Sequence, residues 1–197
     1  MNKRAIATGF VGLSASVLLA AAAMAGDSPA SATSTLSPVT VTQPALDDPT
    51  IVAIFDAANT ADVGTGELAA RRGHSQEVRD FGAMLVRDHK AVRQQGRDLA
   101  KKLGVVPTPP ADDASAKAHK TAMTRLRALR GQAFDHAFLQ HEVAFHKGVI
   151  DAVTTTLLPA IRNAELKDLV VKVAPAFQAH MIAAANLDKK LGNKNGN

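Results

Sequence analysis

Residues 75–104 read SQEVRDFGAMLVRDHKAVRQQGRDLAKKLG and carry the clearest helical pattern of the chain. The large apolar residues in this stretch recur at intervals of four and seven, which places them on one face of an α-helix. The members of this face are Phe81, Leu85, Val92, Leu99 and Leu103. Because Ser75 is a favoured N-cap and Gly104 a favoured terminator, the sequence predicts one amphipathic helix from Ser75 to Leu103.

Helical periodicity continues on both sides of this stretch, and no strand-like alternation interrupts it. The boundary signals predict further helices at 48–72, from Asp112 or Asp113 to Arg130, at 133–158 and at 163–191. Asp48 is expected to cap the first of these helices and Asn163 the last. Pro175 is expected to kink the last helix.

Short joins at Gly73 and Pro159 predict two antiparallel hairpins. The predicted fold is all-α, an up-and-down bundle of four long antiparallel helices plus a shorter accessory helix, over residues 49–193. Residues 26–48 are rich in Ser, Thr, Pro and Ala and are expected to form a flexible linker.

The first 25 residues have the three parts of a secretory signal peptide. Lys3 and Arg4 supply positive charge, residues 5–22 are apolar, and Ala23-Met24-Ala25 offers the small residues of an A-x-A cleavage site. We therefore expect cleavage of residues 1–25 and a periplasmic or secreted protein, with outer-membrane association left open. Retention of the apolar segment as a membrane anchor is the alternative.

Composition excludes several classes of site and partner. The 197 residues contain no cysteine, so disulfides, thiolate zinc sites and iron–sulfur clusters are excluded. Without Lys3 and Arg4 the chain has 21 basic and 18 acidic residues, a charge of +3 that does not indicate a nucleic-acid partner. The basic stretch at 117–130 is expected to be a solvated helix face. Contact with an envelope protein or a membrane surface is the alternative.

Ionisable residues lie on or beside the apolar face of every long predicted helix, where such residues are uncommon. At 100° per residue, Asp88 lies near the centre of its helix face and His89 at the edge. Contact between the two hairpins is left open by the sequence. The candidate residues are Asp62, Asp88, His89, Asp135, Glu142, His146 and His180.

Carboxylates and imidazoles inside a helical bundle are the usual ligands of iron, manganese or zinc. The seven residues are therefore candidate ligands of a divalent metal. A standard di-iron site requires Glu-x-x-His, whereas the nearest approach here is Glu142-x-x-x-His146. A mononuclear site, a degenerate ferritin-like site and a metal-free hydrogen-bond network remain as alternatives.

Motifs of the common enzyme classes are missing from the sequence. No nucleophile elbow, phosphate-binding glycine loop or Ser/His/Asp arrangement occurs, so the sequence does not predict an enzyme. One hypothesis is a metal-binding envelope protein in stress protection or metal handling. The other is a metal-free structural or interaction module in which the same residues fix the helix register. An acid–base hydrolase that uses Asp135 or Glu142 with a histidine is a weaker third hypothesis.

Several segments resemble an exported bacterial family, domain of unknown function 4142, over residues 50–191. The segments run from Asn59 to Ala69, from Val78 to His89, from Phe134 to His146, and from Pro175 to His180. The resemblance implies a ferritin-like bundle in the cell envelope and implies no reaction. By position it singles out Asp62, Asp88, His89, Asp135, His146 and His180. Phe138 stands where the family commonly has tyrosine.

Overall fold

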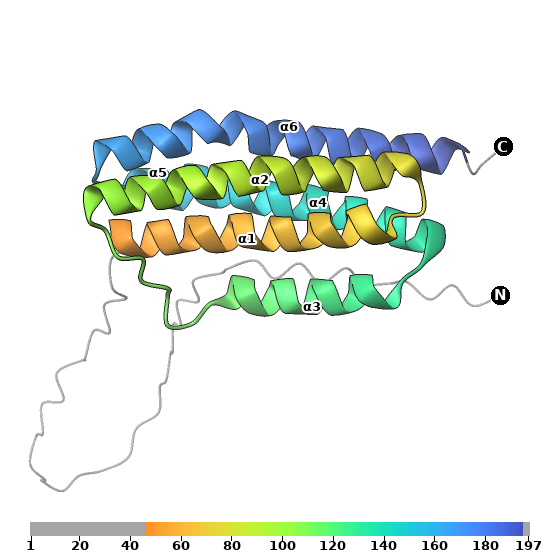
Figure 1. Cartoon of the computed structure of the whole chain (residues 1–197), viewed down its shortest axis with the longest axis horizontal. Coiled ribbons are helices and arrows are strands. Elements are labelled where there is room, and N and C mark those ends of the chain that lie inside the picture. Colours follow the sequence, from red (N-terminus) through yellow and green to blue (C-terminus); the bar gives the residue numbers. More distant parts are fainter. Residues whose placement is uncertain (1–45, 195–197) are drawn as a thin grey trace, which may run out of the picture. The chain divides into compact units, whose positions relative to one another are not determined.

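The computed structural model describes residues 46–194, and all regular structure in that range is helical (Figure 1). The helices are α1 (Asp48–Arg72), α2 (Gln76–Leu103), α3 (Ala114–Ala128), α4 (Gly131–Ala152), the π-helical η1 (Val153–Leu157), α5 (Leu158–Ala160) and α6 (Ala164–Lys194). The predicted all-α class is confirmed. The predicted signal peptide at 1–25 and nearly all of the predicted linker at 26–48 lie outside the described residues. Between residues 46 and 194, no helix is long and apolar enough to cross a membrane.

Ser75 and Asn163 begin α2 and α6 as the sequence predicts. Each side-chain oxygen accepts a hydrogen bond from the amide three residues further on, at 3.2 and 3.1 Å. Gly104 ends α2 in the left-handed conformation, with φ at 66°, which glycine adopts without the steric penalty of a side chain. α6 continues through Pro175 as one helix.

Asp48 has a different role from the predicted one. α1 is capped by Asp47, whose Oδ1 accepts a hydrogen bond from the Thr50 amide at 2.9 Å. Asp48 lies in the first turn, and its two carboxylate oxygens accept hydrogen bonds from the amides of Arg162 and Asn163, both at 2.9 Å. An acid of the first hairpin therefore fastens the join that precedes α6.

The long helices pack as two hairpins, α1 against α2 and α4 against α6. α1 and α2 approach closely at Gly66 and Gly82, since a Cβ atom added to Gly82 would lie 2.7 Å from the Gly66 carbonyl oxygen. The hairpins meet where α2 contacts α6 and where α1 contacts α4. α3 runs alongside α1 and also contacts α4 (Figure 1).

Two apolar clusters stabilise the helices, and a polar band separates them along every long helix. One cluster contains Phe55, Val170 and Phe177, and the other contains Phe81 and Phe138. On α1, for example, apolar residues of the first cluster precede the polar ones and those of the second follow. The band consists of Asn59, Asp62, Thr65, His89, Glu142, His146 and His180, all buried.

The end of the predicted helix 133–158 departs from α-helical geometry. α4 gives way at Val153–Leu157 to a π-helical segment, and α5 then runs to Ala160. Pro159 has no amide hydrogen and its ring crowds the preceding turn, which favours a locally widened backbone. The hydroxyl of Thr155 also competes for the Asp151 carbonyl, at 2.7 Å.

Candidate metal centre

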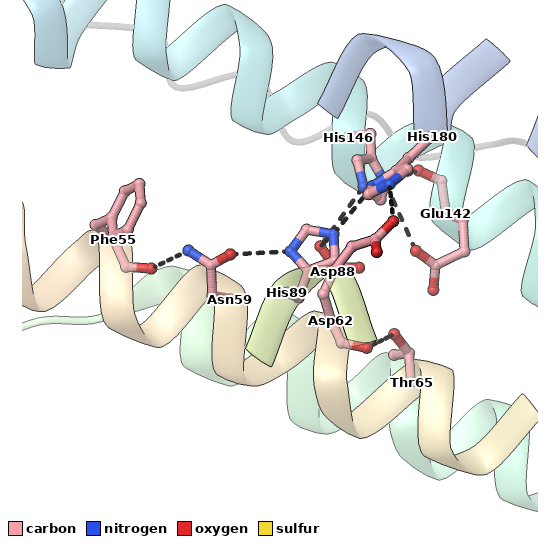
Figure 2. Close-up of polar contacts among 9 residues, drawn as sticks. All are labelled: Phe55, Asn59, Asp62, Thr65, Asp88, His89, Glu142, His146 and His180. Carbon is pink, nitrogen blue, oxygen red and sulfur yellow. Dashed lines mark hydrogen bonds and ion pairs between the residues drawn. The ribbon is translucent and has the colours of Figure 1, made fainter. Parts of the chain in front are cut away.

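Five buried ionisable side chains meet in the polar band (Figure 2). Asp62 comes from α1, His89 from α2, Glu142 and His146 from α4, and His180 from α6. Both hairpins contribute, so the contact between hairpins that the sequence leaves open is made here. All five residues were predicted as candidate ligands.

Asn59 determines how His89 is oriented. Asn59 Nδ2 donates to the Phe55 carbonyl at 2.8 Å, which leaves Asn59 Oδ1 facing His89 Nδ1 at 2.9 Å (Figure 2). Because an amide oxygen only accepts, His89 Nδ1 carries the proton of the neutral ring. His89 Nε2 is then unprotonated, and its lone pair points toward the other members of the cluster.

His146 and His180 are held in the same way. His146 Nδ1 donates to the Glu142 backbone carbonyl at 3.0 Å, which leaves His146 Nε2 unprotonated. His180 Nε2 donates to Asp88 Oδ2 at 3.2 Å, which leaves His180 Nδ1 unprotonated. In metalloproteins, metal-binding histidines are oriented by such outward hydrogen bonds to carbonyl or carboxylate oxygens.

The unprotonated nitrogens lie close together, and those of His89 and His146 face the same Asp62 oxygen. His89 Nε2 lies 3.2 Å from His180 Nδ1 and 3.2 Å from Asp62 Oδ2. His146 Nε2 lies 3.6 Å from the same Asp62 oxygen. Neighbouring nitrogen ligands of a tetrahedral zinc ion, each about 2.05 Å from the metal, are about 3.3 Å apart. The spacing of these donor atoms therefore fits a metal ion.

Burial keeps the three imidazoles neutral at pH 7. Burial, with the neighbouring rings of His146 and His180 adding to it, lowers the pKa of His89 to about 3. Burial likewise lowers the pKa of His146 to about 4, and it lowers the pKa of His180. Neutral imidazole is the form that binds metals, so the rings need not lose protons first.

The two acids of the cluster have no donors to satisfy them. Within residues 46–194, all four carboxylate oxygens of Asp62 and Glu142, together with Nε2 of His146, lack a hydrogen-bond partner. Burial and the adjacent Glu142 raise the pKa of Asp62 well above its usual range. Burial raises the pKa of Glu142 to about 7. Such groups hold a proton or a cation, because an isolated buried carboxylate is costly.

Two overlapping sets of these residues have donor atoms close enough together to hold a metal ion. One set is His89, His146 and His180, and the other is Asp62, Glu142 and His146. Within each set the ligand atoms lie within 4.8 Å of one another, and His146 belongs to both. The residues present thus offer three nitrogens and two carboxylates at one place.

Comparison with known proteins identifies the family. A family model described as "Domain of unknown function (DUF4142)" matches residues 32–187. The chain belongs to this family. The resemblance noted in the sequence is therefore confirmed.

Among solved structures, a crystal structure of a DUF305 fragment from Deinococcus radiodurans is similar in fold, with a TM-score of 0.64 at 15% sequence identity. The match covers 72% of this chain and 95% of that one. None of the curated protein sequences matches the chain.

Asp88 of this DUF4142 chain lies at the edge of the cluster, and His89 lies inside it. The Asp88 side chain is 31% exposed whereas His89 is fully buried, the reverse of the order expected from the helix face. The sequence-based face counted only large apolar residues. The buried face of α2 also includes Gly82 and Gly96, where α1 approaches closely, and this rotates the face toward His89.

Asp135 is not brought to the cluster. Its two carboxylate oxygens accept hydrogen bonds from the backbone amides of His74 and Ser75, at 2.7 and 2.8 Å. These amides belong to the join between α1 and α2. Asp135 belongs to the second hairpin and stabilises the join of the first. Asp48 belongs to the first hairpin and stabilises the join that precedes α6. The structure therefore places Asp135 at the backbone connection and not beside the other candidate ligands.

Sequence reasoning did not assign Asn59 and Thr65 to the site. Both side chains are 1% exposed, and the Thr65 hydroxyl donates to the Asp62 carbonyl at 3.1 Å. A signal was available, because Asn59 lies four residues after Phe55 and three before Asp62 and so shares their helix face. Amide and hydroxyl side chains are not ionisable, so a pattern of ionisable residues on the helix faces does not include them.

Proposed function

We propose that this protein binds a divalent transition-metal ion in its core, through Asp62, His89, His146 and His180, with Glu142 as an additional carboxylate. The observation that carries the proposal is that three unprotonated imidazole nitrogens lie close together, and that those of His89 and His146 lie within 3.6 Å of an Asp62 oxygen without a hydrogen-bond donor. Each ring already donates its one proton outward, to Asn59, to a backbone carbonyl and to Asp88. The inward lone pairs are thus arranged before any ion arrives.

A metal-free network is the competing function, and it satisfies these atoms less completely. His89 Nε2 and His180 Nδ1 face each other at 3.2 Å with no proton between them when both rings are neutral. In the absence of metal, a neutral Asp62 carboxyl donates one proton toward the imidazoles, consistent with its raised pKa. A proton on Glu142 adds a second donor, which the raised pKa of that carboxyl also permits, but two donors still cannot serve three imidazole lone pairs, whereas a cation serves all of them.

The chemistry of the donors narrows the choice of ion. Three imidazoles with one or two carboxylates suit zinc and iron, and also manganese when the carboxylates dominate. Magnesium and calcium prefer sites made of oxygen atoms alone. Glu142 beside the set leaves the protein able to add a fifth ligand. We therefore expect binding of Zn²⁺, Fe²⁺ or Mn²⁺ in preference to Mg²⁺ or Ca²⁺.

We also propose that the protein is an exported envelope protein with a ferritin-like arrangement of its four long helices, acting in metal handling or stress protection. The signal-like pattern of residues 1–25 supports export. The contacts of α1 with α2, α4 with α6, and each hairpin with the other support the arrangement. The donors are enclosed in the core, which leaves little room for a substrate beside the ion and favours metal handling over catalysis.

Metal content and affinity test the proposal directly. The untagged protein is dialysed against trace Zn²⁺, Fe²⁺ and Mn²⁺ under anaerobic conditions, and bound metal is measured by mass spectrometry. About one equivalent is expected, falling to background in Asp62→Asn, His146→Gln and His180→Gln. His136→Gln is the matched control, because that exposed histidine pairs with Asp188 outside the cluster.

The opposite result is equally clear. If the folded wild-type protein retains no metal and the three cluster variants change only the free energy of unfolding, the cluster is a structural hydrogen-bond network. Loss of metal in His136→Gln as well would show that the bound ions are held at the surface.

A further inference from the structure

His180 is the member of the cluster that reaches toward solvent. It is 6% exposed, whereas His89, Glu142 and His146 are fully buried and Asp62 is 1% exposed. Its outward nitrogen, Nε2, lies 3.2 Å from Oδ2 of Asp88, whose side chain is 31% exposed. Asp88 and His180 therefore form a continuous polar path from the surface of α2 to the buried donors (Figure 2).

Packing covers the approaches along the bundle, between α1 and α2, and beside α3. Along the bundle, apolar residues of the two core clusters lie on either side of the polar band. Between α1 and α2, the backbones meet at Gly66 and Gly82. α3 contacts both α1 and α4 and so covers the side where those helices meet. The boundary between α2 and α6 is where charged side chains extend from solvent to the site.

We propose that the metal ion enters between α2 and α6, with Asp88 as the carboxylate that captures it before it reaches His180. This inference rests on the proposed metal-binding function. A partly exposed carboxylate attracts a hydrated divalent cation through its negative charge, whereas the buried imidazoles are neutral and exert no such attraction. Asp88 presents such an oxygen at the surface, one contact away from the first buried ligand.

Arg87 tunes this capture step. Its Nε donates to Asp88 Oδ1 at 2.8 Å, and its side chain is 71% exposed. The guanidinium charge beside the carboxylate repels an incoming cation and occupies one of the two carboxylate oxygens. Removal of the charge therefore speeds capture, whereas removal of the Asp88 charge slows it.

Association kinetics with Co²⁺ test the inference, because Co²⁺ bound to nitrogen and oxygen ligands absorbs visible light. Stopped-flow mixing of the untagged protein with Co²⁺ gives the association rate, and transfer to a chelator gives the dissociation rate. We expect Asp88→Asn to slow association about tenfold and Arg87→Gln to speed it about threefold, changes on the scale of one altered charge near a cation path. Asp98→Asn, an exposed acid on the same helix, is the control and is expected to leave the rate unchanged.

Each result has a separate meaning. An unchanged association rate in both Asp88→Asn and Arg87→Gln, with a normal Co²⁺ spectrum, would overturn the proposed path while leaving the metal site intact. Faster dissociation of Co²⁺ from Asp88→Asn with unchanged association would show that Asp88 only orients His180. A wild-type protein that develops no Co²⁺ absorption would instead contradict the metal-binding function itself.

Discussion

Asp135 and Asp62 are both buried aspartates on the inner faces of long helices, yet their surroundings differ in kind. Asp135 is 3% exposed, and each of its oxygens accepts a hydrogen bond from a backbone amide. Asp62 is 1% exposed, and neither of its oxygens has a hydrogen-bond partner among the described residues. The first carboxylate completes a backbone connection, and the second lacks the partner that a buried charge requires.

This difference shows that burial of an acid does not by itself mark a functional site. The informative feature is whether the surrounding groups already satisfy the acid. Asp48 repeats the pattern of Asp135 at the other end of the hairpins, where it accepts from two amides. Satisfied acids therefore lie at the joins, and unsatisfied acids lie beside the histidines in the middle.

The sharpest test of the comparison is Asp135→Ala. It leaves two backbone amides of the α1–α2 join without their acceptor, and hydrogen bonds to a charged group contribute about 1.5–3 kcal/mol each. We expect the free energy of unfolding in urea to fall by about 4 kcal/mol, with metal affinity unchanged. Asp151→Ala on the same helix is the control, since that acid is exposed and pairs with Lys147. A loss of metal affinity in folded Asp135→Ala would contradict the distinction between the hydrogen-bonded acids at the helix joins and the unpartnered acids beside the histidines.

Glu142→Gln tests whether the middle acids are unsatisfied when no metal is bound. Burial raises the pKa of Glu142 to about 7, so the folded protein holds a proton that the unfolded chain releases near its ordinary pKa of 4.5. The folded state therefore loses stability as pH rises from about 4.5 to 7, by up to about 3 kcal/mol at 1.36 kcal/mol per pKa unit. The glutamine side chain of the variant does not ionise and avoids this loss.

The expected result is that metal-free Glu142→Gln is more stable than wild type at pH 8, and that the advantage shrinks toward pH 5. Urea unfolding in chelator at both pH values measures it, and the exposed Glu165→Gln is the control. The histidines shift stability in the opposite direction, since their lowered pKa values remove stability as pH falls below about 6.5. Their contribution is shared by both proteins. A difference independent of pH would mean that Glu142 is already satisfied.

Asn59→Leu tests the cluster through a residue that is not one of the proposed metal ligands. Leucine removes the acceptor of His89 Nδ1, so the ring is no longer held with Nε2 inward. Loss of such an orienting hydrogen bond weakens metal binding by about 10-fold to 100-fold. We expect a Kd for Zn²⁺ at least about tenfold higher than in wild type.

Thr60→Ala is the control for this substitution, because Thr60 is the next residue on α1 and its hydroxyl bonds to the Asp56 carbonyl on the exposed side. An unchanged Kd in Asn59→Leu would mean that packing alone holds His89. Titration calorimetry at fixed pH distinguishes the two results.

The helices of this fold were largely predictable, because the signals that set them are local. Ser75 and Asn163 cap the helices that they were expected to cap. Asp47 and Asp48 are both suitable N-cap residues for α1. Asp47 takes that position, and Asp48 instead accepts hydrogen bonds from the amides of residues 162 and 163, which are distant in sequence. The π-helical turn at 153–157 was missed, because a proline was expected to end the helix and not to widen the turn before it.

The sequence predicted the kinds of residue in the candidate site, but it did not predict correctly which individual residues lie in it. Periodicity located Asp62, Glu142, His146 and His180 on inner faces, because those faces are marked by large apolar residues. It misjudged His89, since glycines on α2 contribute to the buried face and carry no hydrophobic signal. It included Asp135, because the sequence of one helix does not show which backbone amides another connection presents to it.

Glu67→Gln is expected to have the smallest effect, because it alters an exposed acid that belongs neither to the helix joins nor to the polar band. Glu67 lies on α1 between Asp62 and the join, yet its side chain is 40% exposed and pairs with Lys90 at 3.0 Å and Arg71 at 3.8 Å. Exposed ion pairs contribute about 0–1 kcal/mol, so the free energy of unfolding should change by less than about 0.5 kcal/mol. Metal stoichiometry should stay the same. A loss of bound metal in Glu67→Gln would mean that acids outside the polar band also hold the ion. Lys90→Gln removes the other partner of the same ion pair and keeps the Glu67 charge. Loss of metal in Glu67→Gln alone would assign the effect to the charge, and loss in both variants would assign it to the ion pair.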